Sequence, residues 1–301
     1  MYRRIVIRNM TLDKRITKDL TELYNNGALN GSISEATGLK SVIKGGVSTK
    51  GLPGYFTGNR NANKNTVFVT LNPGQDVAAA NKNLKCEICK FNIDTSSLSY
   101  FISSYKASRI DFGNRSKGSA FDVKQARFLQ AWIGSGIDFP KNFPAERKSY
   151  PETKRNVLLQ KLQLELVPYC SKKFEVNQKA MGKLLPFIET LLTEIFSAER
   201  KYVIFAGSIF EELFKLYNNE VNANYCIAFL HRNSKVITFQ SSYTIQSHCC
   251  VCEISRDTDG KTIKALIANT FPYPRLAGKG MSDYGKFCYD EYRKQMVTTI
   301  P

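Results

Sequence analysis

The chain has 301 residues, 43% of them hydrophobic and 23% charged, a balance that excludes a collagen, a coiled coil and a wholly disordered protein. Its 43 lysine and arginine residues outnumber 26 aspartate and glutamate residues, which gives a net charge of +17. A surplus of this size favours a polyanionic partner, with nucleic acid as the first candidate and an anionic membrane surface as the second.

The first predicted element is a helix over residues 13–24, where Ile16, Leu20 and Leu23 recur at helical spacing before a stop signal at residues 25–27. Residues 44–64 are rich in glycine, asparagine and basic side chains, and they predict a long loop. This loop is either a flexible linker or a loop that tracks a nucleic-acid strand, with Tyr55 and Phe56 stacking on bases.

The middle of the chain predicts alternating strands and helices. A β-branched apolar run predicts a buried strand over 66–71, alternating leucines predict a second over 162–166, and a third is expected over 202–206. Between the last two, residues 176–198 are expected to be helical, with a kink at Pro186.

A capping box is expected to open the next helix, because Ser208 is followed three residues later by Glu211. Further strands are predicted over 236–239, 247–254 and 262–268, and a final helix over 282–296. Strands that alternate with helices indicate an α/β sheet covered on both faces. We expect a helical and loop extension over 1–63 and one domain over 64–301, with an insertion near 110–154.

Two segments that follow predicted strands carry the functional signal. In open α/β sheets ligands collect at the carboxyl ends of strands. The first strand runs directly into Asn72-Pro73-Gly74, although a strand followed by these residues is also an ordinary turn. The last predicted strand runs into Asn269-Thr-Phe-Pro-Tyr-Pro-Arg275, followed by the glycine-rich, basic stretch 276–280.

Together the two segments resemble the motifs of the uracil-DNA glycosylase superfamily, in particular its mismatch-specific and single-strand-selective branches. In that family the first motif reads Gly-x-Asn-Pro-Gly, and the second reads His-Pro-Ser-Pro-Arg or Asn-Pro-Ser-Gly. The resemblance covers residues from about 64 to the C-terminus. The chain departs from the motifs at Thr70, Phe271 and Tyr273. The resemblance implies a three-layer αβα fold with a short, mainly parallel central sheet, and an enzyme that flips a nucleotide and hydrolyses its base–sugar bond.

In this resemblance Asn72, held by Pro73, positions the attacking water, and Pro73, Phe271 and Tyr273 contact the flipped base. A weak activator suffices because departure of the base leaves an oxocarbenium-like sugar. Asp76 is a second candidate for activating the water or stabilising the cation. Its alternative is a solvated aspartate at a helix N-terminus.

The departing base takes up negative charge, so donors must stabilise it. Phe271 stands where the family has histidine or asparagine and cannot donate, which leaves backbone N–H groups or Tyr273. This favours a base that leaves more easily. Arg275 and Lys279 are expected to grip phosphates, or else to be simple surface charge. The remaining DNA contacts are assigned to Gly74 and Ser208.

Glu165 lies where the family strand carries the asparagine that reads uracil. A carboxylate only accepts hydrogen bonds, so it would repel the O4 atom of uracil but accept from the N4 amino group of a cytosine. We therefore expect a cytosine-type, modified base. A register shift of one residue would instead turn Glu165 outward. Within the wider group, a glycosylase that attacks modified cytosines in phage DNA suggests a defence role beside base excision repair.

Eight cysteines are scattered along the chain rather than spaced as a small secreted framework, which favours a reducing, cytoplasmic and nucleoid-associated location. Cys86 and Cys89 have metal-ligand spacing, and Cys249, Cys250 and Cys252 could complete a site, but the alternation of a strand favours a core role for the last three. We expect no metal and no cofactor. Trp132 and Phe128 line either the base pocket or the core.

Met1–Asn9 lacks the apolar core of an export signal, and the charge-free stretch 236–252 is too polar and too short to span a bilayer. The expected partner is therefore DNA, without a membrane and without an obligate protein partner. A rival hypothesis is a non-catalytic DNA-binding regulator, because residues 33–43 faintly resemble the second and third helices of a helix-turn-helix around Gly38.

Overall fold

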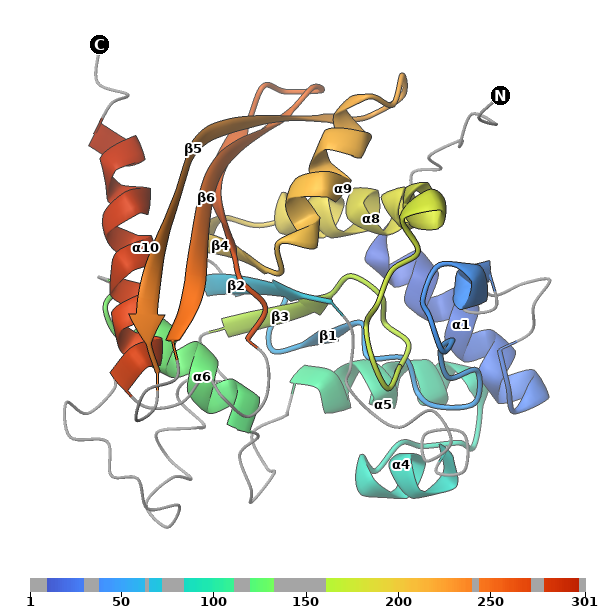
Figure 1. The fold of residues 1–301 in the computed structure, drawn as a ribbon. Coiled ribbons are helices and arrows are strands. Elements are labelled where there is room, and N and C mark those ends of the chain that lie inside the picture. Colours follow the sequence, from blue (N-terminus) through green and yellow to red (C-terminus); the bar gives the residue numbers. More distant parts are fainter. Residues whose placement is uncertain are drawn as a thin grey trace.

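The computed structural model describes residues 10–29, 38–62, 65–71, 84–110, 120–132, 161–239, 244–271 and 279–297. Within them the chain is an α/β protein built on one mixed sheet of seven strands in the order β1-β3-β2-β4-β7-β6-β5 (Figure 1). The strands are Phe56–Thr57 (β1), Asn65–Thr70 (β2), Lys161–Glu165 (β3), Arg200–Ala206 (β4), Tyr225–Thr238 (β5), Thr244–Arg256 (β6) and Thr262–Ala268 (β7). The central strands β3, β2, β4 and β7 are parallel, and the others pair antiparallel.

Helices pack on both faces of this sheet, as Figure 1 shows. α1, α5, α8 and α9 share one hydrophobic cluster with the sheet, and α6 and α10 share a second cluster with its opposite face. The helices are α1 (Leu12–Asn26), α4 (Leu84–Lys90), α5 (Leu98–Ile110), α6 (Ala120–Leu129), α8 (Leu185–Ile195), α9 (Ile209–Asn218) and α10 (Lys279–Val297), with the 3-10 helices η1 (Leu39–Ser41) and η3 (Gln178–Leu184).

The central strands are apolar on both sides because helices cover both faces of the sheet. In β2, Val67 and Val69 lie in the first cluster, whereas Phe68 lies in the second. In β4, Phe205 lies in the first cluster and Ile204 in the second. Burial on both faces accounts for the continuous apolar runs that predicted these strands.

The described part of residues 1–63 packs into the first cluster through α1 and through β1, which pairs with β3. Tyr55 and Phe56 are 3% and 2% exposed, and the Tyr55 hydroxyl donates to Asp19 Oδ2 at 2.9 Å. Buried rings cannot stack on nucleobases, so that expectation is wrong. The linker interpretation is also wrong for the described residues, because Leu52 and Val47 are core side chains as well.

α6 and α10 approach closely at Gly285. A Cβ atom there would stand 1.8 Å from the carbonyl oxygen of Phe128, so a larger residue would push the helices apart. The Gly285 carbonyl also accepts a hydrogen bond of 3.0 Å from Trp132 Nε1. Trp132 and Phe128 are buried in the second cluster, which places them in the core. Residues 111–119 and 133–154 of the expected insertion lie outside the description.

Two local expectations need correction. The helix predicted over 176–198 is η3 followed by α8, and Pro186 lies in the first turn of α8, where a missing amide hydrogen costs no helical hydrogen bond. After Gly38 the described chain forms the single 3-10 turn η1, and Ile43 then makes an antiparallel bridge to Val176. The described residues therefore form no recognition helix there.

Among the helices that the structure describes, none combines the length and the apolar composition needed to cross a lipid bilayer.

Candidate functional site at the carboxyl ends of the strands

The carboxyl ends of the four parallel strands lie along one edge of the sheet. Thr70 of β2 is in register with Glu165 of β3, and Ala206 of β4 is in register with Ala268 of β7. The chain passes from β2 to β3 on one side of β2 and continues in β4 on its other side, so the strand order reverses here. Ligands of open α/β sheets bind at such a reversal. We take this edge as the candidate site.

Glu165 is a buried acid at this edge, with 8% of its surface exposed. Its Oε2 accepts from the Thr70 hydroxyl at 2.6 Å, and its Oε1 accepts from Gln163 Nε2 at 2.6 Å. Burial raises the pKa of Glu165 to about 7, and these two hydrogen bonds and the charges of Lys161 and Arg109 oppose that rise. The side chain therefore titrates near neutral pH. Because Glu165 is buried, the alternative that a register shift turns it outward is wrong.

A polar ladder continues from Glu165 along the same face of β3. Lys161 and Gln125 of α6 are 1% and 0% exposed, and Lys161 Nζ donates to Gln125 Oε1. Gln163 Oε1 lies 3.4 Å from Lys161 Nζ and accepts from Gln125 Nε2 at 3.3 Å. The Gln163 amide thus turns its oxygen toward a cation and its NH₂ toward the carboxyl group. The hydrogen bond from the Gln163 NH₂ group therefore helps to fix the rotamer of Glu165.

The sequence analysis missed Lys161 and Gln163. The available signal was their alternation with Leu162 and Leu164, because a central strand covered on both faces would ordinarily be apolar at every position. A polar residue at each second position indicates that one face of the strand has another role.

Phe271 lies on the face of the sheet that carries Phe68. Its ring centroid is 6.0 Å from that of Phe68 and 5.2 Å from that of Phe128, and its side chain is 4% exposed. Aromatic packing alone accounts for this position, so a contact between Phe271 and a base stays a prediction. Phe271 therefore serves as an apolar anchor where the chain leaves β7.

The end of β2 is held next to the end of β4. The Leu71 carbonyl accepts from Val167 N at 2.9 Å, which continues the pairing with β3 up to the residue before Asn72. A Cβ atom on Gly207 would stand 3.0 Å from Leu71 Cδ2 and 3.4 Å from Thr270 Cγ2. Gly207 is therefore the residue that lets the chains leaving β2, β4 and β7 meet.

Ser208 is exposed, and its side chain makes no capping hydrogen bond, so the expected capping box with Glu211 is wrong. Its backbone is in the right-handed helical region, whereas capping geometry requires an extended N-cap residue. Ser208 lines a hollow of about 350 Å³. The other lining residues are mainly charged: Glu211, Glu212, Lys215, Arg232 and His248.

Hydrogen bonds to β6 and α10 also hold the chain that leaves β7. Asn269 Oδ1 accepts from His248 N at 3.1 Å, and Asn269 N donates to the Tyr284 hydroxyl at 2.7 Å. That hydroxyl donates in turn to the His248 carbonyl at 2.6 Å. β6, β7 and α10 therefore converge on the residue that begins the second sequence motif.

Several predicted site residues lie outside the described part of the chain: Asn72, Pro73, Gly74, Asp76, Tyr273 and Arg275. Lys279 begins α10, but its side chain also lies outside the description. The structure places their neighbours instead. Leu71, directly before Asn72, and Phe271, within the second motif, both lie just beyond the ends of parallel strands.

The cysteines of the possible metal site are divided between two environments. Cys86 and Cys89 are exposed on α4, whereas Cys249, Cys250 and Cys252 are buried in β6. Burial raises the pKa of Cys250 to about 12 and also raises that of Cys252, so the neutral thiol is favoured over the thiolate that binds metals. Among the residues described, no three histidine, cysteine, aspartate or glutamate side chains gather as a metal ion would require.

Comparison with known proteins finds no matching family model, no matching curated protein and no matching solved structure.

Proposed function

We propose that the protein is a monofunctional DNA glycosylase, which turns a nucleotide out of DNA and hydrolyses the bond between its base and its sugar. The position of Glu165 carries the proposal. This buried carboxyl group is in register with Thr70, which stands two residues before Asn72 in the sequence. A group able to read a base thus lies beside the segment proposed to hold the attacking water.

Three further observations support the proposal. The motifs around Asn72 and Phe271 resemble those of the uracil-DNA glycosylase superfamily, and both follow parallel strands that end at the same edge. Helices on both faces of the sheet agree with the three-layer αβα fold that the resemblance implies. The net charge of +17 suits a DNA partner in the cytoplasm.

The proposed reaction divides the work between the two motifs. Asn72 orients a water molecule toward the sugar carbon while the bond to the base breaks, so little nucleophilic activation is needed. Asp76 is the second candidate for supporting that water or the developing sugar cation. Phe271 donates no hydrogen bond to the departing base. Backbone N–H groups or Tyr273 therefore stabilise it, which favours bases that leave readily. Arg275, Lys279, Gly74 and Ser208 are the proposed DNA contacts.

Glu165 gives the proposed enzyme its choice of base. Above pH 7 its ionised carboxylate accepts hydrogen bonds and suits the amino group of a cytosine-type base. Below pH 7 the protonated form also donates, which suits a keto oxygen such as O4 of uracil. Removal of modified cytosines would serve base excision or defence against phage with modified DNA.

The release of cytosine-type bases is expected to rise with pH through about 7, since this is where Glu165 loses its proton. Release of uracil, if present, is expected to fall over the same interval. The measurement is kcat/KM against pH for both substrates, with Glu165→Gln as the variant that lacks the titrating group. Parallel pH profiles for the two bases would separate Glu165 from base choice.

The test of the proposed function is a base-release assay with purified full-length protein. Single- and double-stranded DNA would carry uracil, thymine mismatches, cytosine or modified cytosines, and abasic sites would be detected by alkaline cleavage. The proposal expects abasic sites at the positions of at least one cytosine-type base. Efficient release of uracil alone would refute the choice of base. Specific binding that leaves every strand intact would point to a non-catalytic DNA-binding protein.

Replacement of Gly207 by alanine is expected to lower activity more than stability. The added methyl group would displace the Leu71 side chain by a few tenths of an ångström, at a cost of about 1–2 kcal/mol. Because Leu71 precedes Asn72, we expect a drop of about tenfold or more in base release. Thermal unfolding and single-turnover rates would be compared with those of Gly38→Ala, where the backbone is in the right-handed helical region and a Cβ atom meets nothing within 4 Å. Unchanged turnover in Gly207→Ala would contradict this coupling.

A further inference from the structure

Two segments joined by backbone hydrogen bonds extend from the carboxyl end of β3. Gly54 N donates to the Pro168 carbonyl at 2.5 Å, Ser48 N to the Cys170 carbonyl at 2.8 Å and Lys44 N to the Glu175 carbonyl at 2.8 Å. We call residues 39–54 and 168–184 the basic ribbon. The ribbon starts beside the site, because Glu165 N donates to the carbonyl of Tyr55, the residue after its first segment, at 3.1 Å.

The inner side of the ribbon is part of the core. Leu39, Val42 and Ile43 are 2%, 0% and 0% exposed and belong to the first hydrophobic cluster. This packing holds the ribbon against the core, so the side chains on its outer side form a preformed surface.

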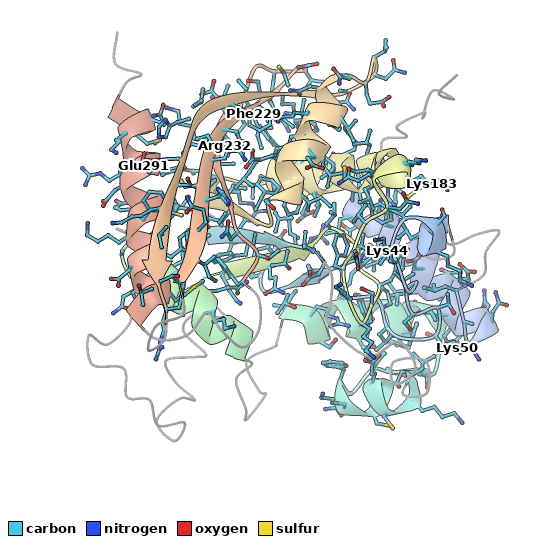
Figure 2. All side chains as sticks on the ribbon, in the orientation of Figure 1. Lys44, Lys50, Lys183, Phe229, Arg232 and Glu291 are labelled. Atoms are coloured by element: carbon cyan, nitrogen blue, oxygen red, sulfur yellow. The ribbon has the colours of Figure 1, made fainter. Side chains whose placement is uncertain are left out.

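The outer side is strongly basic. The two segments contain one acidic residue, Glu175, and seven lysines, all exposed: Lys40, Lys44, Lys50, Lys172, Lys173, Lys179 and Lys183. Figure 2 shows Lys44, Lys50 and Lys183 on the same side of the molecule. Seven cations less one anion give +6, about a third of the net charge of +17.

This charge is poorly compensated. Glu175 accepts from both Lys44 and Lys173, at 2.8 and 2.9 Å, and these two partners lower its pKa to about 2. Lys183 Nζ donates to a neutral partner, Ser41 Oγ, at 2.9 Å. Lys40, Lys172 and Lys179 form no ion pair within the described part of the chain. The neighbouring acids Glu87 and Glu212 already accept from Leu52 N and Gln178 Nε2.

The shape and chemistry of the ribbon fit a chain of phosphates rather than a membrane. From Pro168 to Glu175 it extends at most about 25 Å, a length over which one DNA strand presents about seven phosphates. None of the exposed large hydrophobic side chains in the described residues lies on the ribbon, although insertion into a lipid interface would use such side chains.

We infer that the basic ribbon binds the sugar–phosphate backbone of DNA on one side of the nucleotide that Glu165 reads. This inference rests on the proposed function for the identity of the polyanion, since the ribbon begins beside the proposed base site. Lysine ammonium groups give charge without base readout, so the contact adds affinity for any sequence and depends strongly on salt.

The test compares two triple variants that lose the same charge. The ribbon variant is Lys40→Gln, Lys172→Gln, Lys179→Gln. The control is Lys14→Gln, Lys201→Gln, Lys261→Gln, which removes exposed lysines from the start of α1, from β4 near its amino end and from the residue before β7. Fluorescence anisotropy would give the Kd for a 30-nucleotide DNA at several KCl concentrations, with folding checked by thermal unfolding.

The ribbon variant is expected to reduce the slope of log Kd against log[KCl] by about two to three, since each lost phosphate contact contributes about 0.7–0.9. The control is expected to change it by less than about one, and a Lys→Arg triple on the ribbon is expected to restore the wild-type slope. Equal slopes for ribbon and control variants would overturn the inference. So would binding to vesicles of anionic lipid that the ribbon variant loses while its DNA binding stays intact.

The two proposals fail separately. If wild-type protein releases no base but the ribbon variant still loses its salt dependence, the glycosylase proposal fails and the ribbon remains a DNA-binding surface. If base release is observed and the slopes do not differ, the ribbon inference alone is wrong.

Discussion

Replacement of Glu165 by glutamine is expected to change which base is released. A glutamine amide presents a donor beside an acceptor, so the variant should lose about 10- to 100-fold in kcat/KM on a cytosine-type base and gain on uracil. Such a range corresponds to about 1–3 kcal/mol, the usual discrimination of a good hydrogen-bonded base contact. Competition between the two substrates in one reaction would measure the ratio directly.

The same variant should fold well. Gln163 Nε2 can still donate to the new amide oxygen, and the Thr70 hydroxyl can turn to the Leu164 carbonyl, which lies 3.3 Å away. In the wild-type protein the pKa of Glu165 rises from 4.5 to about 7 on folding. Its contribution to stability is therefore complete below pH 4.5 and is lost as the pH rises through 7.

Glu165→Gln removes this pH-dependent loss of stability, because glutamine does not ionise. Above pH 7 the variant should be more stable than the wild-type protein by about 1–3 kcal/mol, measured by urea unfolding at pH 5 and pH 8. Glu199→Gln, an exposed change of the same kind just before β4, serves as the control. A variant that is more stable but has lost its base preference would indicate that the acid is kept for function. Unchanged base preference would remove Glu165 from base reading.

Replacement of Asn72 by alanine is expected to abolish base release, with a fall of about 10³-fold or more in the single-turnover rate. The side chain proposed to orient the water is removed, while the ribbon and the Glu165 site are unchanged. The affinity for DNA should therefore stay within about twofold of the wild-type value, with the same salt dependence.

The matched control is Asn222→Ala, which makes the same chemical change in the exposed turn between α9 and β5. It should retain wild-type release. If Asn72→Ala also retains release, the attacking water is held elsewhere, and Asp76 becomes the first candidate. Asp76→Asn would then decide between them.

The central strands could be predicted from the sequence because burial on both faces leaves a continuous apolar run. β2, β4 and β7 begin and end within two residues of the expected bounds. β5 could not be predicted in full, since only its last residues were expected over 236–239 and the strand begins at Tyr225. Most of its side chains from Ala228 to Val236 are exposed, so no apolar alternation marks it.

For residues 44–62 the prediction of a linker or a nucleic-acid-tracking loop was wrong for the opposite reason. Its glycines and asparagines indicate a loop, and it is largely irregular, yet its few apolar side chains are core residues supplied by long-range packing. Ser208 shows the limit of a local motif. The spacing to Glu211 is that of a capping box, but the tight turn after Gly207 places Ser208 in a helical conformation that cannot form one.

At the candidate site, the sequence predicted that Glu165 lies at the end of a strand. It did not predict the hydrogen bonds or the raised pKa of this side chain. The Gln125 side chain that completes the ladder comes from α6, a helix distant in sequence from β3. The raised pKa of Glu165 comes from burial, which depends on how those helices pack. Sequence reasoning therefore identified the acid and missed the polar side chains that orient it.

The proposed activity is tested most directly by the identity of the free base in solution. Wild-type protein would be incubated at pH 8 with DNA that contains uracil and modified cytosines in equal amounts, and the small-molecule fraction would be analysed by mass spectrometry. A glycosylase of this kind is expected to release a free cytosine-type base that is missing with Asn72→Ala. A fraction that contains no base, or uracil only, would contradict it.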